Sequence, residues 1–192
     1  VTRQAVTPGR HDLFAAAGSA PRAILVTHLD TVPGALPIRR DGDTLFGRGS
    51  CDAKGAAAAM IGAARTLLAR GRSDFGVLLV VGEETTSDGA IAANALVASG
   101  ELGWPCGDAL VGEPTGNAWA SAHPGVAVAT LTTRGRAGHS SVPGTGDSAI
   151  HALVRWLGAL LDAPWPGETS AQVGRIDGGT APNVVAERAR AE

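Results

Sequence analysis

The stretch GVLLVV (residues 76–81), followed directly by Gly82-Glu83-Glu84, decides the fold of this chain. A short, almost wholly apolar run of this kind predicts a strand buried on both faces, as in a parallel sheet covered by helices. Residues 23–26 (AILV) and 109–111 (ALV) predict two more strands of the same kind. Each run is followed by polar residues, so the three strands are expected to present polar groups at one edge of the sheet.

Helical segments separate these strands. The Ala-rich residues 53–70 predict a helix with Asp52 as its N-cap, and residues 88–99 predict a second one. Strand, helix, strand, helix, strand is typical of a parallel sheet with right-handed crossovers. The fold class expected for residues 1–116 is therefore α/β, with a mostly parallel sheet flanked by helices.

The pattern changes in residues 117–192, which are expected to form a second, smaller domain. Residues 127–133 alternate as a half-exposed strand would, and Asp147 is expected to cap a strongly amphipathic helix. Residues 171–176 predict another strand, and a further strand-like segment begins at residue 184. This part is expected to be an incomplete α+β domain inserted into the first.

Composition excludes several classes of function. The 192 residues carry a formal net charge of −2, which offers no electrostatic footprint for nucleic acid or an anionic membrane. No apolar run approaches the roughly 18 residues that a membrane span needs, and the start, Val1-Thr2-Arg3-Gln4, has no hydrophobic stretch like a secretion signal. Cys51 and Cys106 show no C-x-x-C spacing, so we expect no disulfide framework and a cytoplasmic location.

The polar residues at the strand ends predict a metal site. The carboxyl ends of parallel strands meet in the crevice where open α/β sheets bind their ligands. His28, Asp52, Glu84 and Glu113 would bring imidazole nitrogen and carboxylate oxygens there. Such donors suit Zn²⁺, with Co²⁺ or Mn²⁺ as alternatives. Asp52, between sheet and helix, is placed to bridge two ions about 3.5–4 Å apart.

Two further carboxylates have expected roles beside the metal. Asp30 follows His28 by two residues, a spacing that lets its carboxylate hold the distal ring nitrogen and fix the tautomer. Glu83 and Glu84 are adjacent and cannot both point the same way on extended backbone. One can face the metal while the other faces water, where a general base contributes about 10²–10⁴ in rate.

Six stretches in this order identify a resemblance: HLDTVP (28–33), GRGSCDAKG (47–55), GEE (82–84), GEPT (112–115), RGRAGHSS (134–141) and GRIDGGTAPN (174–183). The chain resembles the M20 metallopeptidase family, the group of acetylornithine deacetylase, succinyl-diaminopimelate desuccinylase and carboxypeptidase G2. The resemblance implies that His28 and Glu113 bind one metal ion. It also implies that Asp52 bridges, that Glu84 binds the other ion, and that Glu83 is the general base.

The resemblance also implies a lid domain that forms a homodimer. His139 would be lent to the second subunit's site to stabilise a tetrahedral oxyanion, and Asn183 would contact substrate. Family members are considerably longer, so the chain is expected to be truncated at both ends and to lack the second metal's histidine. We therefore expect one ion to bind well, the second weakly, and activity of the chain alone to be small.

Three functions are compatible with these residues. The first is deacylation of small N-acyl amino acids, because HLDTVP, CDAKGAAAA and GRAGHSS are similar to the acetylornithine deacetylase branch. The short loop between Pro33 and Gly47 is instead similar to deacylases that release lysine or ornithine from a carrier protein. The second is a dipeptidase or carboxypeptidase of the same family. The third is a non-catalytic relative, against which the intact Glu83 argues.

Overall fold

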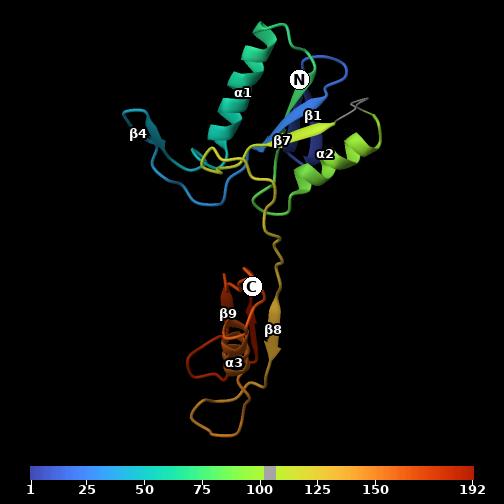
Figure 1. Ribbon diagram of the computed structural model, residues 1–192. Coiled ribbons are helices and arrows are strands. Elements are labelled where there is room, and N and C mark those ends of the chain that lie inside the picture. The colour runs from blue at the N-terminus through green and yellow to red at the C-terminus, as the bar shows by residue number, and fades with distance from the viewer. Residues whose placement is uncertain (102–106) are drawn as a thin grey trace. The chain divides into compact units, whose positions relative to one another are not determined.

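The computed structural model describes residues 1–101 and 107–192, so Cys106 lies outside the described residues. The chain divides into two compact units, residues 1–121 and residues 122–192. Figure 1 shows the helices and strands of both units. Among the described residues, no helix combines the length and the apolar character that crossing a bilayer requires.

The first unit is built around a five-stranded sheet in the order β1-β2-β6-β3-β7. Its elements are β1 (Thr2–Thr7), β2 (Arg10–Ala16), β3 (Ala23–His28), β4 (Arg39–Asp41), β5 (Thr44–Phe46), α1 (Lys54–Ala69), β6 (Phe75–Val80), α2 (Asp88–Ala98) and β7 (Asp108–Val111). Strand β3 is parallel to both β6 and β7, while β2 is antiparallel to β6 and β1 is antiparallel to β2. The predicted α/β class is confirmed, and the sheet is mixed because two antiparallel strands extend one edge.

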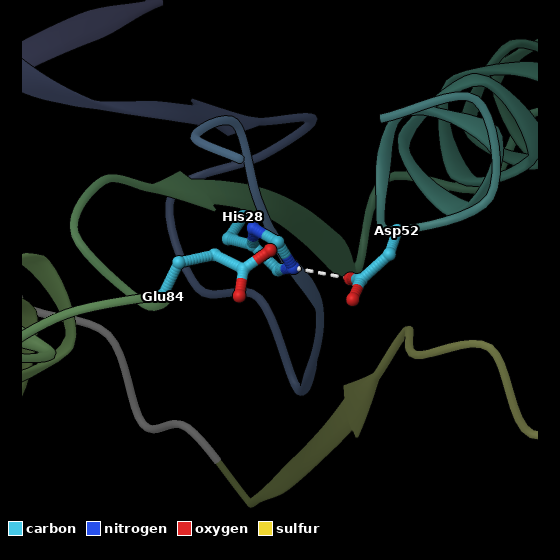
Figure 2. A group of neighbouring side chains, drawn as sticks. All are labelled: His28, Asp52 and Glu84. Atoms are coloured by element: carbon cyan, nitrogen blue, oxygen red, sulfur yellow. Dashed lines mark hydrogen bonds and ion pairs between the residues drawn. The ribbon is translucent and has the colours of Figure 1, made fainter. Parts of the chain in front are cut away.

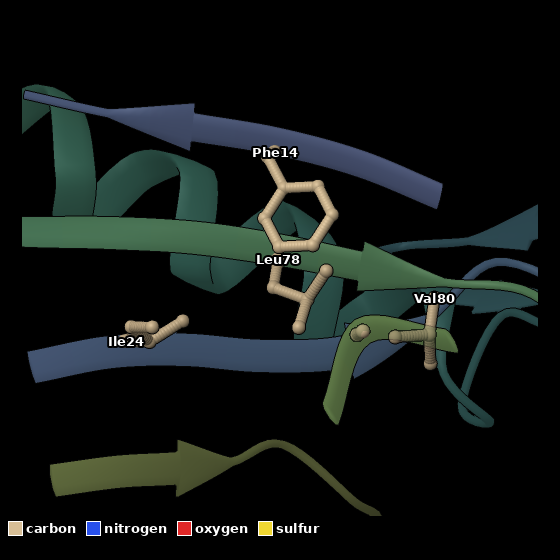
Figure 3. Packing of buried hydrophobic residues seen from close by; sticks show 5 residues of the cluster. Phe14, Ile24, Leu78 and Val80 are labelled. Atoms are coloured by element: carbon tan, nitrogen blue, oxygen red, sulfur yellow. The ribbon is translucent and has the colours of Figure 1, made fainter. Parts of the chain in front are cut away.

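The core of this unit lies between the sheet and α2. Phe14, Ile24, Leu78 and Val80 pack together with Ala93 of α2, as Figure 3 shows for the four strand residues. Successive side chains of a strand point to opposite faces. The odd-numbered residues of β6 therefore face the other side, where α1 contacts β3 and β6. Burial of both faces explains why the central strands are continuous apolar runs.

The structure differs from the sequence analysis of this unit in its strands and at the start of α1. Strands β1 and β2 and the β4–β5 hairpin were not predicted, because β2 buries a charged residue, Asp12, and all residues of the hairpin are exposed. Asp52 does not cap α1: Ala53 is the N-cap residue and provides no side-chain hydrogen bond. The Asp52 carboxylate instead bonds the ring of His28. A buried ring nitrogen competes successfully for this carboxylate.

The second unit is a three-stranded antiparallel sheet covered by one helix. It contains β8 (Leu131–Arg134), α3 (Ala149–Leu161), β9 (Ile176–Gly178) and β10 (Arg188–Ala191), with the strand order β8-β10-β9. Its core consists of apolar side chains from α3 and β10, namely Ala149, Leu153, Leu157, Ala189 and Ala191. The amphipathic stripe of α3 therefore covers one face of the sheet.

The element boundaries in this unit differ from the predicted ones. The strand predicted over 127–133 is confined to β8, the one over 171–176 begins only at Ile176, and the last one is β10. Asp147 is not the cap of α3. The Ser148 side chain accepts the backbone N–H of His151 at 3.2 Å, while the backbone of Asp147 pairs with Arg136. That pairing keeps Asp147 outside the helix.

Candidate metal centre

Three of the four predicted ligands, His28, Glu84 and Glu113, come from the carboxyl ends of the three parallel strands, and Asp52 lies just before α1. His28 is the last residue of β3, Glu83 and Glu84 follow β6, and Glu113 follows β7. Hydrogen bonds continue the strand pairing beyond the strands themselves, from Leu29 N–H to the Val80 carbonyl at 2.9 Å and from Gly112 N–H to the Val26 carbonyl at 2.8 Å. These bonds hold the strand ends at one edge of the sheet.

His28 and Asp52 form the closest pair in this group. Their Nε2 and Oδ1 atoms are 2.9 Å apart, and the His28 side chain is only 1% exposed. Figure 2 shows the Glu84 carboxylate turned toward the same ring. One ligand atom each from His28, Asp52 and Glu84 lie within 4.8 Å of one another, an arrangement that could hold a metal ion.

Two more carboxylates approach the same ring nitrogen. The Oε2 atoms of Glu83 and Glu113 each lie 3.9 Å from His28 Nε2. The structure thus brings together all five residues that the sequence predicts around the metal, four of them carboxylates. Carboxylate oxygen and imidazole nitrogen are the donor set that Zn²⁺ and similar divalent ions prefer.

The tautomer of His28 is set by a backbone group. Its Nδ1 lies 3.1 Å from the carbonyl oxygen of Asp30, and a carbonyl can only accept. Nδ1 therefore carries a proton, and Nε2 faces the carboxylates. The 2.9 Å bond from Nε2 to Asp52 needs a proton there, which a bound metal ion would replace. The sequence predicted the Asp30 carboxylate in this role, which is wrong in detail. That carboxylate is 3.6 Å from Nδ1 and outside hydrogen-bond distance.

The Asp30 carboxylate holds the next loop instead. Its Oδ1 accepts the backbone N–H of Glu83 and its Oδ2 that of Glu84, both at 3.2 Å. The residue therefore touches both sides of the centre, His28 through its carbonyl and the two glutamates through its carboxylate. A second bond, from Val32 N–H to Glu84 Oε1 at 3.3 Å, helps to orient Glu84.

The charges of the site favour a cation. Burial alone would lower the pKa of His28, but the hydrogen bond to Asp52 and the charges of Glu113 and Glu83 outweigh it and raise the pKa. Burial raises the pKa of Glu113, and the neighbouring carboxylates raise it further, although His28 opposes them. The neighbouring carboxylates contribute to both shifts, and a divalent ion would relieve the repulsion between them.

Two residues beside the centre complete its surroundings. The Lys54 ammonium group donates to the Leu29 carbonyl at 3.2 Å, which links the start of α1 to the turn after His28. Cys51 is a free, exposed thiol next to Asp52. The sequence predicts no role for either, and neither side chain is a member of the group of possible ligands found among the described residues.

The remaining predicted site residues, His139 and Asn183, lie in the second unit. Two hydrogen bonds join their segments, from Ser140 N–H to the Asn183 carbonyl at 3.0 Å and from Val185 N–H to the Gly138 carbonyl at 2.8 Å. The His139 Nδ1 accepts the backbone N–H of Ser141 at 3.3 Å and lies 2.8 Å from its hydroxyl. The neutral ring then carries its proton on Nε2, which is free to donate.

Comparison with known proteins finds relatives of this chain in one family. Residues 121–192 match the family model described as peptidase dimerisation domain, M20_dimer. The chain is 38% identical to a peptidase M20 domain-containing protein of Schizosaccharomyces pombe, over 95% of the chain and 47% of the relative. The chain belongs to the M20 metallopeptidase family.

Other M20 relatives show the same partial coverage. A protein of Aspergillus flavus named "probable carboxypeptidase" is 36% identical over the whole chain and 52% of its own length. A protein of Aeropyrum pernix, named for hydrolysis of LysW-lysine or LysW-ornithine, is 40% identical over 95% of the chain and 49% of its own length. The chain thus spans about half the length of the curated relatives it matches.

Solved structures agree on the M20 fold. A tripeptidase of Staphylococcus aureus superposes with a TM-score of 0.62 at 24% identity, covering 94% of this chain and 51% of that one. An M20 family metallo-carboxypeptidase of Sulfolobus solfataricus gives a TM-score of 0.55 at 13% identity, covering 94% of this chain and 58% of that one. At these identities the likeness is one of fold.

Proposed function

We propose that this chain binds divalent metal ions at the common edge of β3, β6 and β7. We further propose that it serves a hydrolase that cleaves the amide bond of small N-acyl amino acids, as acetylornithine deacetylase does. The observation that carries the proposal is the convergence of four carboxylates on one buried imidazole. In this proposal residues 1–116 are the catalytic domain and residues 117–192 the lid.

The residues fit a pair of divalent ions. His28 and Glu113 would hold one ion, Asp52 would be shared, and Glu84 would hold the other. The bond from His28 Nδ1–H to the Asp30 carbonyl supports this assignment, because it turns Nε2 toward the carboxylates, where a metal ion would replace the Nε2 proton. Four carboxylates beside a neutral imidazole also balance the charge of two divalent ions. When bound, such ions would lower the pKa of water and polarise a carbonyl group.

Glu83 is the proposed general base. Its carboxylate would take a proton from the attacking water while the water oxygen bonds to the carbonyl carbon of the substrate. The same carboxyl group would then give that proton to the leaving nitrogen as the C–N bond breaks. The two backbone bonds to Asp30 support this role, since they hold the loop that carries Glu83. The Nε2–H of His139 from a second subunit would stabilise the oxyanion.

A peptidase activity is the second candidate. The name of the relative from Aspergillus flavus, a probable carboxypeptidase, favours it. The chemistry at the metal edge would be the same, because both reactions hydrolyse an amide bond beside an amino acid. The name of the Aeropyrum pernix relative adds a third class of substrate, an amino acid carried on a protein.

Substrate assays on the metal-loaded chain test the proposal. The chain is first titrated with Zn²⁺, Co²⁺ or Mn²⁺ by calorimetry. It is then assayed in excess metal with acetylornithine, acetylcitrulline, succinyl-diaminopimelate and dipeptides. We expect metal-dependent release of the free amino acid from an N-acyl substrate. Turnover of dipeptides alone would favour the peptidase, whereas metal binding with no turnover in the panel would favour a non-catalytic relative. If the chain binds none of these metal ions, the proposed metal site and the hydrolase activity that depends on it are both contradicted.

The number of protein ligands gives an expected order of binding. One ion would have His28, Glu113 and Asp52, while the other would have Asp52 and Glu84. We therefore expect two unequal steps in the calorimetric titration, because each missing ligand leaves a position to water. Two equally tight ions per chain would contradict this distribution of ligands.

A further inference from the structure

Three charged side chains outside the metal centre lie behind the loop that carries Glu83 and Glu84. Asp12, on β2, is completely buried, and its Oδ1 accepts the backbone N–H of Val81 at 3.0 Å. Arg10, also on β2, forms a two-pronged ion pair with Asp88 at 2.7 and 3.2 Å. Asp88 is the first residue of α2. We call Arg10, Asp12 and Asp88 the β2–α2 cluster.

The ion pair of this cluster is packed directly against Gly82. Gly82 has a φ of +78°, and a Cβ at this position would overlap Asp88 Oδ1 and Arg10 Nη2. Its carbonyl oxygen accepts the N–H groups of the turn that follows, the shortest bond coming from Ser87 at 2.7 Å. Only glycine combines this backbone conformation with such a close approach.

Four successive residues are therefore held from two directions. The cluster holds Val81 and Gly82 from β2 and α2, and Gly89 of α2 also donates to the Val81 carbonyl at 3.0 Å. From the other direction, Asp30 accepts the N–H groups of Glu83 and Glu84. Backbone fixed in this way sets the directions in which the two glutamate side chains leave the chain.

The surroundings of the second carboxylate oxygen of Asp12 lack a hydrogen-bond donor among the described residues. This Oδ2 atom is buried without a hydrogen-bond partner among the described residues, and so is Oε1 of Gln4, its direct neighbour across the β1–β2 pair. Burial raises the pKa of Asp12, and the negative charge of Asp88 raises it further. The hydrogen bond from the Val81 N–H and the charge of Arg10 act in the opposite direction but do not outweigh them. The Val81 N–H needs an acceptor on residue 12, which the oxygen of a neutral amide would supply as well as a carboxylate.

We propose that Asp12, together with the Arg10–Asp88 pair, is a positioning residue that aims Glu83 and Glu84 at the metal ions. The roles of the two glutamates rest on the proposed function. That the cluster fixes the backbone of the loop does not. Groups that orient metal ligands from behind commonly change metal affinity by about 10–100-fold when they are removed.

The test compares variants of the full chain. Asp12→Leu removes the acceptor for Val81, whereas Asp12→Asn keeps it and turns an amide donor toward Gln4. Phe14→Leu is the matched control, because Phe14 lies on the same strand and packs in the core, where it is 1% exposed. Arg10→Met is a milder second probe if Asp12→Leu does not fold, since the Arg10 side chain is 41% exposed.

Two readouts separate positioning from general stability. The first is amide hydrogen exchange of Val81, Glu83 and Glu84 without metal, and the second is Zn²⁺ affinity by calorimetry. For Asp12→Leu we expect faster exchange at these amides and Zn²⁺ binding weakened by about 10–100-fold. Arg10→Met should also speed the exchange and weaken Zn²⁺ binding, but to a smaller extent than Asp12→Leu. Asp12→Asn should match the wild type within about twofold, and Phe14→Leu should lower stability without moving either readout.

Several results would overturn the inference. The cluster would be merely structural if the Asp12→Leu and Arg10→Met variants behaved like Phe14→Leu in amide exchange and in Zn²⁺ affinity. An Asp12→Asn variant as impaired as Asp12→Leu would show that the charge, and not the acceptor, is required. If wild-type chain binds no Zn²⁺, the proposed function fails, while the exchange of the loop amides still decides whether the cluster positions the loop.

Discussion

Asp30 is the residue that joins the two sides of the metal centre. Its carbonyl oxygen fixes the ring of His28, and its carboxylate fixes the backbone of Glu83 and Glu84. A carboxylate that accepts two backbone N–H groups is satisfied without the imidazole. The division of tasks explains why one acidic residue beside the histidine can serve both the ligand and the proposed base.

Replacing Glu83 tests the proposed base at this scale. Glu83→Gln keeps the size of the side chain and its backbone bond to Asp30 but removes the group that accepts a proton. We expect kcat to fall by about 10²–10⁴ while the metal content stays unchanged. Steady-state kinetics and elemental analysis of the same preparation measure both quantities.

Glu84→Gln is the matched control for this experiment. Glu84 belongs to the group of possible ligands around His28, so its replacement should reduce the metal content. If Glu83→Gln loses metal and Glu84→Gln keeps it, the roles of the two residues are exchanged.

At the scale of elements, parallel strands and helix starts place the functional groups. Strands β3, β6 and β7 end at one edge of the sheet, and Asp52 reaches that edge from the residue before the N-cap of α1. In the second unit, Ser148 caps the start of α3, and the spacing of apolar residues along this helix gives the stripe that packs on β8 and β10.

The cap of α3 gives a prediction for stability. Ser148→Ala removes the acceptor for the His151 N–H, so the free energy of unfolding of the second unit should fall by about 1 kcal/mol. Asp147→Ala is the matched control, since its side chain makes only an exposed ion pair with Arg136 at 3.5 Å and should cost far less. Urea unfolding followed at the amide signals of α3 measures both. A larger loss for Asp147→Ala would contradict the assignment of the cap.

At the scale of the whole molecule, the M20 dimerisation domain suggests a homodimer. The described part of the second unit contains His139, whose Nε2 is free to donate, and the metal ligands all belong to the first unit. A site that draws on both units can be completed within one chain or between two. The proposal assigns His139 to the site of the second subunit.

Mixing two inactive variants distinguishes these possibilities. A heterodimer of Glu83→Gln and His139→Ala subunits contains one site with both intact residues only if His139 acts between subunits. After subunit exchange we expect about a quarter of the wild-type activity, because half of the dimers carry one intact site of two. Light scattering checks the dimer. Activity that does not recover although heterodimers form would place His139 in its own subunit's site.

Much of the fold could be predicted from local patterns. The apolar runs of β3 and β6 specify their strands because these strands are buried on both faces, and the Ala-rich sequence of α1 has strong helix propensity. The run of residues 109–111 does form a strand, β7, but the prediction that it is buried like the others is wrong, because β7 is an edge strand whose residues are exposed. Strand β2 was missed because it buries Asp12 beside Phe14, which no alternating pattern predicts. The β4–β5 hairpin was missed because all six of its residues are exposed.

The chemistry of the centre is a property of the sequence by itself: the residue types and their positions after successive strands predict His28, Asp52, Glu83, Glu84 and Glu113 as one cluster. Only the tertiary structure decides which atom of Asp30 meets which partner, and that a buried acid on β2 lies behind Gly82. These contacts join residues that are distant in the chain, such as Asp12 and Val81. Local periodicity carries no information about them, since they arise only when the sheet has brought separate strands side by side.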